Sequence, residues 1–327
     1  MKAPAPVLDG AAEAIKPPPI EIVTLRLLDD TLLEPDVALR LAGLADSLPR
    51  PRSVMLQLAQ AGDDPAELAR IVATDPATAA LLLRTVNSAQ FSLRSEITSI
   101  QHAITYLGAN LVRDVAIRHA MTVPAAGRNL TTERIYQGLW RNSYLASGIA
   151  LALAQRLRLA APAATSTQAL LFMLGDIALV SHYPQIADLY NADLDLAVLV
   201  AGTQERLGFN SAMVGAHLAQ VWQLPAGLRV ALRKSLMPLV SGPDTLDPET
   251  APGLVVSYFS NRLAQALWRQ VDFDLVDAMQ ALRERPEAYY LPQHLAAVGL
   301  QDALSALTEP AVERRLASLV KGLSAPR

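Results

Sequence analysis

Residues 75–91 read DPATAALLLRTVNSAQF, and this stretch decides the fold class. An aspartate followed by a proline predicts a helix start, because the carboxylate caps free backbone N–H groups and proline suits the first helical position. Alanine and leucine then continue the helix, since both are strong helix formers. Asn87 and Ser88 end it, as asparagine favours helix C-termini. The stretch therefore predicts a short apolar helix with a defined start and end.

Similar patterns continue on both sides of this helix. Asp64-Pro65-Ala66-Glu67 repeats the cap-plus-proline start and adds a glutamate that can close a capping box. The apolar run at residues 22–28 fits a short strand or a helix. Residues 122–131 are a predicted linker, and residues 238–252 a long polar turn. Further helices are expected at 35–45, 54–61, 97–107, 111–121, 135–159, 169–183, 194–207, 212–223, 227–237 and 253–268, and the tail continues helical to about residue 323.

The composition agrees with an all-α protein. Hydrophobic residues make up 51% of the chain but aromatic residues only 5%, so the core is built from alanine, leucine and valine. The absence of cysteine excludes disulfides, thiolate catalysis and cysteine-ligated zinc. The net charge is −3, whereas nucleic-acid-binding proteins typically carry an excess of basic residues. The fold class predicted is therefore all-α, with a large core and an unlikely role for nucleic acid.

Neither the start of the chain nor its apolar stretches predict a membrane protein. Residues 1–20 are rich in proline and alanine, have no apolar segment of the signal-peptide type and are interpreted as a disordered tail. Residues 145–154 are too short to cross a bilayer, and residues 169–180 carry Asp176. Both stretches are expected to be buried core helices, and the protein is expected in the cytoplasm.

Several short motifs, in their order along the chain, resemble the HD-related output domain (HDOD). The resemblance covers residues 46–240 directly and the rest loosely. Its first half rests on Leu48-Pro49, Asp75-Pro76, Leu82 to Phe91, Ile97 to Ile100, Ala103-Ile104 and Leu107-Gly108. Its second half rests on Trp140 to Ser143, Met173 to Ala178, Glu205, Leu207-Gly208, Val214-Gly215 and Trp222 to Pro225. HDOD proteins are the non-catalytic relatives of the HD-type metal-dependent phosphohydrolases.

In those hydrolases, histidines and aspartates on several helices hold a metal whose hydroxide attacks a phosphoester. The resemblance implies that nearly all of these positions are vacated here. The first His position holds Asn142, and the His-Asp pair is Gly175-Asp176. The later His positions hold Ser211, Ser235 and Leu236, and the final Asp position holds Asn261. Only Asp176 is retained, and a single carboxylate does not hold a transition metal tightly. No enzyme activity, catalytic residue, metal or cofactor is therefore expected.

No other catalytic pattern replaces the vacated one. The five histidines are scattered without i, i+4 pairs and are interpreted as core-edge or surface residues: His102, His119, His182, His217 and His294. Asp176 lies in an apolar helix, where a hydrogen-bonded structural role is more common than a general acid or base with a raised pKa.

The remaining motif residues are candidates for an interaction surface. Asn87, Ser88 and Phe91 are expected to lock a turn between two helices, and they also suit a polar recognition spot between the two halves. Arg84, Arg113 and Arg118 fit solvated helix faces better than a phosphate-binding groove. The segment from Glu67 to Ser88 has some helix-turn-helix character. Asp75-Pro76 in its turn argues against binding in the major groove of DNA. The full set is Asp75, Pro76, Arg84, Asn87, Ser88, Phe91, Ser99, Gly108, Trp140, Asp176, Trp222 and Pro225.

Together these observations predict two packed helical subdomains, the second HD-hydrolase-like but without a complete set of metal ligands. The expected divisions are a tail (1–20), a short extension (21–45), a first helical half (46–121), an HD-like half (132–244) and a C-terminal helical extension packed on it (245–327). The resemblance implies a bacterial signal-transduction adaptor that binds another, unidentified signalling protein. The alternatives are a sensor of a nucleotide such as a cyclic dinucleotide, a divergent phosphohydrolase, or a DNA-binding regulator.

Overall fold

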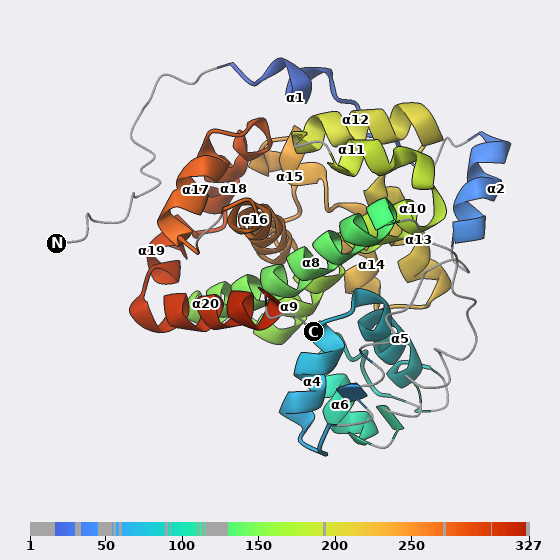
Figure 1. Cartoon of the computed structure of the whole chain (residues 1–327), viewed down its shortest axis with the longest axis vertical. Coiled ribbons are helices and arrows are strands. Elements are labelled where there is room, and N and C mark those ends of the chain that lie inside the picture. Colours follow the sequence, from blue (N-terminus) through green and yellow to red (C-terminus); the bar gives the residue numbers. More distant parts are fainter. Residues whose placement is uncertain are drawn as a thin grey trace.

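The structure is a computed structural model of the chain. It describes residues 17–29, 34–44, 54, 57–58, 61–88, 91, 93–109, 111–112, 115, 130–191, 194–270, 273–301 and 303–324. Within these residues every regular element is a helix, and none is a strand (Figure 1). The prediction of an all-α fold is therefore confirmed. Residues 1–16 of the predicted tail, most of helix 111–121, residues 122–129 of the predicted linker, and Arg113, Arg118 and His119 lie outside the described residues. The predicted tail of 1–20 is wrong at its end, because Ile20 begins a helix.

The first helical lobe contains three helices that pack on one another, α4 (Pro65–Ala73), α5 (Pro76–Val86) and α6 (Ile100–Leu107). Their starts follow from local capping. Asp64 accepts a hydrogen bond from the Ala66 N–H, and Asp75 accepts from the N–H groups of Ala77 and Thr78. Both predicted caps are thus confirmed. In Figure 1 this lobe lies below the rest of the molecule.

The HD-like half begins with the longest helix and continues in shorter ones. Its elements are α8 (Leu130–Arg156), α9 (Pro162–Leu171), α10 (Leu174–His182), η4 (Pro184–Ile186), α11 (Ala187–Asn191), α12 (Leu196–Leu207), α13 (Ser211–Val221), α14 (Ala226–Arg233), α15 (Met237–Val240) and η5 (Pro243–Thr245). α8 packs along α9, and α10 packs on α13, which in turn contacts α14. The lobes meet where α5 and α6 contact α9.

Four predicted boundaries are wrong. The helix expected at 169–183 is two helices, since α9 already starts at Pro162 and the chain turns at Phe172–Met173 before α10. The helix expected at 227–237 ends at Arg233, and α15 begins at Met237 within the predicted polar turn, with a proline in its first turn. The helix expected from 97 begins at Ile100, because Ser99 accepts the His102 N–H and caps it there. Residues 130–131 of the predicted linker belong to α8.

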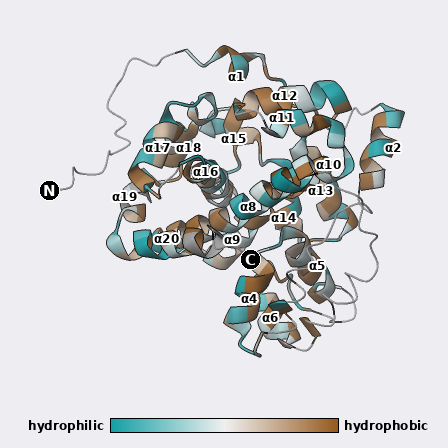
Figure 2. Ribbon diagram, viewed as in Figure 1, coloured by the Kyte–Doolittle hydropathy of each residue, from teal (hydrophilic) through white to brown (hydrophobic). Residues whose placement is uncertain are grey.

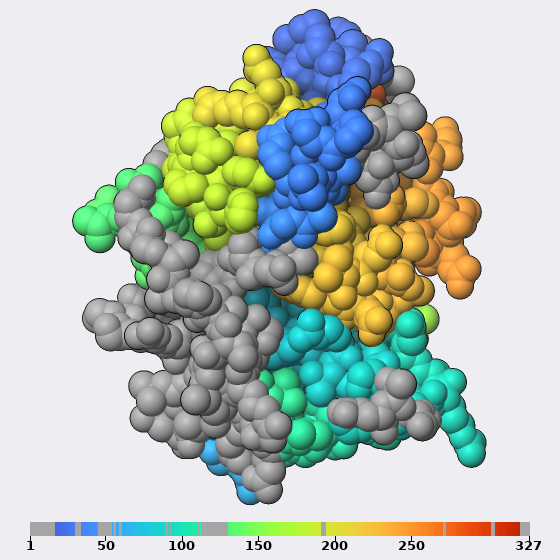
Figure 3. Space-filling view, turned by 90° about the vertical axis from the view of Figure 1, so that its right-hand side faces the viewer, coloured from blue at the N-terminus to red at the C-terminus, as the bar shows by residue number. Residues whose placement is uncertain are grey.

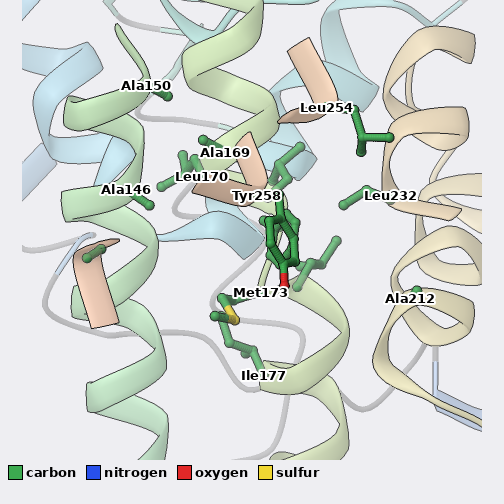
Figure 4. Packing of buried hydrophobic residues seen from close by; sticks show 14 of the residues in the cluster. Ala146, Ala150, Ala169, Leu170, Met173, Ile177, Ala212, Leu232, Leu254 and Tyr258 are labelled. Carbon is green, nitrogen blue, oxygen red and sulfur yellow. The ribbon is translucent and has the colours of Figure 1, made fainter. Parts of the chain in front are cut away.

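The helix α16 (Ala251–Trp268) lies at the centre of the HD-like core, where it packs on α8 and α9. Tyr258, on this helix, is fully buried and donates a 2.7 Å hydrogen bond to the Glu287 backbone oxygen. Figure 4 shows its ring between Ala169 and Leu170 on one side and Leu232 and Leu254 on the other. Because α16 fills this core, residues after 245 complete the HD-like half as well as extend it.

The remaining C-terminal helices cover that core from outside. The tail expected to be helical is broken into α17 (Leu275–Arg283), η6 (Pro286–Ala288), α18 (Leu291–Ala297), α19 (Ala303–Leu307) and α20 (Pro310–Ser324). α19 and α20 pack on α8, and Arg156 in α8 forms a 2.9 Å ion pair with Glu309. Hydrophilic and hydrophobic residues alternate along α20 (Figure 2). Such alternation suits a helix with one buried face.

The N-terminal extension lies on the HD-like half. It contains α1 (Ile20–Thr24) and α2 (Pro35–Gly43), so the open choice between strand and helix resolves to helix. Buried apolar side chains anchor it, and the side chain of Gln204 in α12 pairs with its backbone. The Gln204 amide accepts from the Leu28 N–H and donates to the Arg26 carbonyl, both at 2.9 Å. Figure 3 shows α2, in blue, lying against the yellow surface of the HD-like half, where it contacts α13.

One apolar stretch, Pro162–His182, is long and apolar enough to cross a membrane by length and composition alone. Most of it is buried inside the protein, as α9 and α10 in the core. The predicted burial of residues 169–180 is therefore confirmed.

His294 in α18 is expected to make stability depend on pH. It is fully buried, and its Nε2 donates to the Ser241 backbone oxygen at 2.8 Å. Burial lowers the pKa of His294, against a smaller opposing effect of that hydrogen bond. The unfolded chain therefore binds more protons below about pH 6.5, so this group makes the free energy of unfolding fall as pH falls through that value.

Urea unfolding of the wild type and of His294→Gln at about pH 7.5 and pH 5.5 measures this effect. We expect the variant to lose less stability on acidification than the wild type. His102→Gln, at an exposed position, is the matched control. Equal pH slopes for wild type and His294→Gln would contradict the prediction.

Candidate functional site

Two of the vacated ligand positions form a neutral amide pair in the core. The Asn142 Nδ2 on α8 donates to the Asn261 Oδ1 on α16 at 3.1 Å, across 119 residues of sequence. The Asn261 Nδ2 donates to the backbone oxygens of Ala169 (3.1 Å) and Ser257 (2.9 Å). Both asparagines are buried. At these two positions, which the resemblance assigns to metal ligands, the chain joins α8, α9 and α16 by hydrogen bonds between uncharged groups.

The third vacated position, Gly175, is filled by the backbone of the next helix pair. A Cβ atom built on Gly175 would lie 1.9 Å from the Ser211 backbone oxygen and 2.9 Å from the Gly215 nitrogen. Real Cβ contacts do not occur at such distances. The close approach of α10 and α13 thus excludes any side chain at residue 175.

Asp176 is buried and lies beside Gly175 in the first turn of α10. Its Oδ1 accepts a 2.8 Å hydrogen bond from the Tyr190 hydroxyl of α11. Burial raises the pKa of Asp176, while hydrogen bonds from Tyr190 and Ser211 and the positive charge of Arg262 act in the opposite direction. Burial and the Asp176 carboxylate also raise the pKa of Tyr190. The hydrogen bond therefore ties α10 to α11, as a structural aspartate would.

The last two positions, Ser235 and Leu236, are buried in the turn between α14 and α15. Leu236 lines a cavity of about 420 Å³, together with Asn142, Asp176 and Ser211. Four of the vacated or retained positions therefore meet around one cavity, although they come from different parts of the sequence.

The residues around this cavity do not fit a metal ion. Transition metals need several imidazole, thiolate or carboxylate ligands on one site. In the described part of the chain no three histidines, cysteines, aspartates or glutamates lie close enough together to hold one. Among the described residues, the groups that act on the Asp176 carboxylate are the hydroxyls of Tyr190 and Ser211, the charge of Arg262 and its own backbone N–H.

The histidines do not assemble a second site. His102 and His182 are exposed and His217 is half-buried, in agreement with the interpretation as surface or core-edge residues. His294 is fully buried, so that interpretation is wrong for this residue. It was missed because its partner, the Ser241 carbonyl, lies 53 residues away and leaves no local pattern.

In the first lobe, Asn87 holds the turn after α5. Its side chain accepts from the Ile97 N–H (2.8 Å) and donates to the Ile97 oxygen (2.9 Å) and the Leu83 oxygen (2.8 Å). The predicted turn lock is therefore present. The backbone φ of Asn87 is −88°, so the left-handed geometry that asparagine tolerates is not used here. Ser88 donates to the Thr85 oxygen at 2.7 Å.

Other motif residues lie near the same turn. Phe91 packs edge-on against Tyr106, with ring centroids 6.1 Å apart. Gly108 ends α6 with a φ of 78°, a value that favours glycine. Arg84 is half-buried rather than solvated, and desolvation lowers its pKa.

Within the described residues, hydrogen bonds join this lobe to the HD-like half. The Ile100 N–H donates to the Thr167 hydroxyl of α9 at 3.3 Å, and the Ala226 N–H at the start of α14 donates to Glu96 at 2.9 Å. Pro225 is buried directly before α14, and Trp222, half-buried, ends α13. Trp140 is half-buried on α8, and its Nε1 has no hydrogen-bond partner within the described residues. The motifs around Ile100 and Pro225 thus lie at the junction of the lobes.

Among the cavity residues that sequence reasoning missed are Tyr190, Arg262 and Trp268. Arg262 is 3% exposed, an unusual burial for arginine. One signal for it was in the sequence, because Arg262 directly follows Asn261 inside an apolar helix. Tyr190 and Trp268 carry no such signal.

Comparisons with known proteins agree with this geometry. A family model described as the HDOD domain matches residues 48–237, more than half of the chain. A virulence factor of Campylobacter jejuni has a similar structure at 18% identity, with a TM-score of 0.59 over 89% of this chain and 98% of that chain. The MmoQ response regulator of Methylococcus capsulatus is 22% identical, with a TM-score of 0.55 over 84% of this chain and 96% of that one. At these identities the likeness shows the fold.

A search of curated proteins also finds an uncharacterized protein of Treponema pallidum that is 28% identical over 207 residues. The match covers 58% of this chain but only 37% of that protein, so the relative is considerably longer than the matched region.

Proposed function

Because the chain belongs to the HDOD domain family, we propose that it is a regulatory or adaptor protein of bacterial signal transduction. It acts by binding another protein, and its HD-like scaffold does not hydrolyse phosphoesters. The observation that carries this proposal is the Asn142–Asn261 pair and the Gly175 backbone contact, which lie at positions that the resemblance assigns to metal ligands. Groups bonded to one another in this way leave no ligand set for a hydroxide-generating metal.

An aromatic pair on the first lobe supports the binding role. Phe91 is half-buried and Tyr106 is 47% exposed, and both lie beside the turn that Asn87 holds. Aromatic residues are enriched at protein interfaces because they bury much apolar area with few rotatable bonds. The pair therefore offers a defined place to probe partner binding.

The experiment tests the two parts of the proposal on the same preparation. The purified chain is assayed for bound Mn, Fe and Mg and for hydrolysis of bis-p-nitrophenyl phosphate and cyclic di-GMP. We expect no stoichiometric metal and no hydrolysis above that of Asp176→Asn. Hydrolysis that this substitution abolishes would overturn the non-enzymatic reading.

Partner binding is measured by affinity capture from bacterial lysate with the wild type, Tyr106→Ala and Val230→Ala. Val230 is 41% exposed on α14 and is the matched control for truncating an exposed apolar side chain. We expect a signalling protein to be retained by the wild type and the control, and to be reduced with Tyr106→Ala. Equal retention by all three would place the interface elsewhere, and no specific retention would contradict the adaptor role.

A further inference from the structure

The cavity beside the vacated metal positions is built as a ligand site. At about 420 Å³ it falls within the range of small-molecule pockets, roughly 300–1,000 Å³. Its walls are mostly apolar and include Phe172, Met173, Leu199 and Trp268. A few polar groups among apolar walls is the usual composition of such sites.

Three polar atoms of the residues that line it are buried without a hydrogen-bond partner in the described part of the chain. They are the Nε of Arg262, the Nε1 of Trp268 and the Oδ1 of Asn142. Arg262 and Asn142 are 3% and 5% exposed. Buried polar atoms are nearly always paired, so each needs an explanation.

The orientation of the Asn142 amide is set by its neighbours. The Asn261 nitrogen faces two carbonyl oxygens, so its Oδ1 is the atom that faces Asn142. Asn142 must therefore turn its nitrogen to Asn261, which leaves its oxygen as the unpaired atom. Two N–H donors and one carbonyl acceptor of the lining residues are therefore buried without a partner in the described part of the chain.

The charge of the cavity favours an anion. Its charged lining residues within the described chain are Arg134, Arg262 and Arg269 against Asp176 alone. Asp176 accepts a hydrogen bond from the Tyr190 hydroxyl, and its charge opposes that of Arg262, so two arginines remain in excess. Arginine N–H groups bind phosphate and carboxylate oxygens strongly when both are shielded from water.

We propose that this cavity binds a small organic anion. Its phosphate or carboxylate group accepts hydrogen bonds from Arg262 and Trp268, and a hydroxyl or amino group donates to Asn142. An apolar or planar part packs against Phe172 and Leu199. This goes beyond the adaptor role, because it gives the protein a small-molecule input at the place where the hydrolases bind metal.

The test uses one variant that removes the charge and one that fills the mouth of the cavity. Arg262→Gln keeps a polar side chain but loses the guanidinium. Gly138→Trp adds a large side chain at an exposed cavity-lining position, where a Cβ meets nothing within 4 Å. Gly227→Trp is the matched control, at an exposed helical glycine outside the cavity with equally open space.

Binding of AMP, GMP, cyclic di-GMP, 4-hydroxybenzoate and inorganic phosphate is measured by calorimetry on the full chain, with unfolding curves of every variant. We expect at least one organic anion to bind the wild type and Gly227→Trp equally. Its affinity should fall by about tenfold or more in both cavity variants, as expected for loss of a charge-assisted contact. The nucleotides carry phosphate and 4-hydroxybenzoate carries a carboxylate, so their relative affinities show which of the two groups the cavity binds.

Three results would overturn the proposal. The first is that no organic anion in the panel binds the wild type. The second is that Gly138→Trp binds the organic anion as tightly as the wild type. This variant should fold even if Arg262→Gln does not. The third is inorganic phosphate binding as tightly as the organic anions, which would remove the role of the apolar walls. None of these results bears on the capture of a protein partner, which is measured separately.

Discussion

Gly175→Ala is expected to lower the free energy of unfolding by about 3 kcal/mol or more, or to prevent folding. The single added carbon would lie 1.9 Å from the Ser211 oxygen and 2.7 Å from its carbonyl carbon. Both atoms belong to the backbone of α13, so no side-chain rotation relieves the overlap. The helices α10 and α13 must move apart, and the buried groups between them lose contact.

Urea unfolding followed by circular dichroism measures this effect, with Gly138→Ala as the control. Gly138 also lies within a helix, and its Cβ would meet nothing within 4 Å. Alanine there should be neutral or stabilising by up to about 1 kcal/mol, because glycine is the poorer helix former. Equal stability of Gly175→Ala and Gly138→Ala would show that the two helices do not pack as closely as described.

The same contact predicts the outcome of restoring the hydrolase residue. Gly175→His should be at least as destabilising as alanine, since its ring must also be placed between the two helices. The vacated position is therefore closed by packing, and a single reversion cannot rebuild the ligand set.

Asn261→Asp is expected to cost about 3–5 kcal/mol at neutral pH, although it changes the shape of the side chain very little. Asn261 is 0% exposed, and its nitrogen donates to the Ala169 and Ser257 carbonyl oxygens. A carboxylate cannot donate, so two buried carbonyls would face a buried negative charge instead of an N–H group. The cost combines lost hydrogen bonds with the burial of an uncompensated charge.

The cost should also depend on pH. Burial raises the pKa of such an aspartate above its value of about 3.9 in the unfolded chain. The stability deficit of Asn261→Asp therefore shrinks as pH falls through the raised pKa, because the side chain becomes neutral. Unfolding at several pH values tests this, with Gln185→Glu as an exposed amide-to-acid control that should change stability by no more than about 0.5 kcal/mol. A small deficit that does not vary with pH would contradict the burial of Asn261.

Local signals in the sequence predicted the helices better than their ends. The starts of α4 and α5 were correct because Asp64 and Asp75 cap groups only two or three residues away. The break between α9 and α10 was missed, since the apolar run through Phe172 and Met173 continues without glycine or proline. There the packing against other helices decides where the chain turns, and a sequence pattern does not record it.

By itself the sequence determined the all-α class and the capped starts of α4 and α5, and it placed no histidine at the positions that the resemblance assigns to metal ligands. These properties depend on residue identity and on neighbours within one helical turn. The tertiary structure decided the rest. It joined Asn142 to Asn261, brought the Ser211 backbone onto Gly175 and buried Arg262. It also placed Asn142, Ser211 and Arg262 around one cavity. Such contacts form between helices far apart in the chain, and which pairs meet is set by the packing of the whole core.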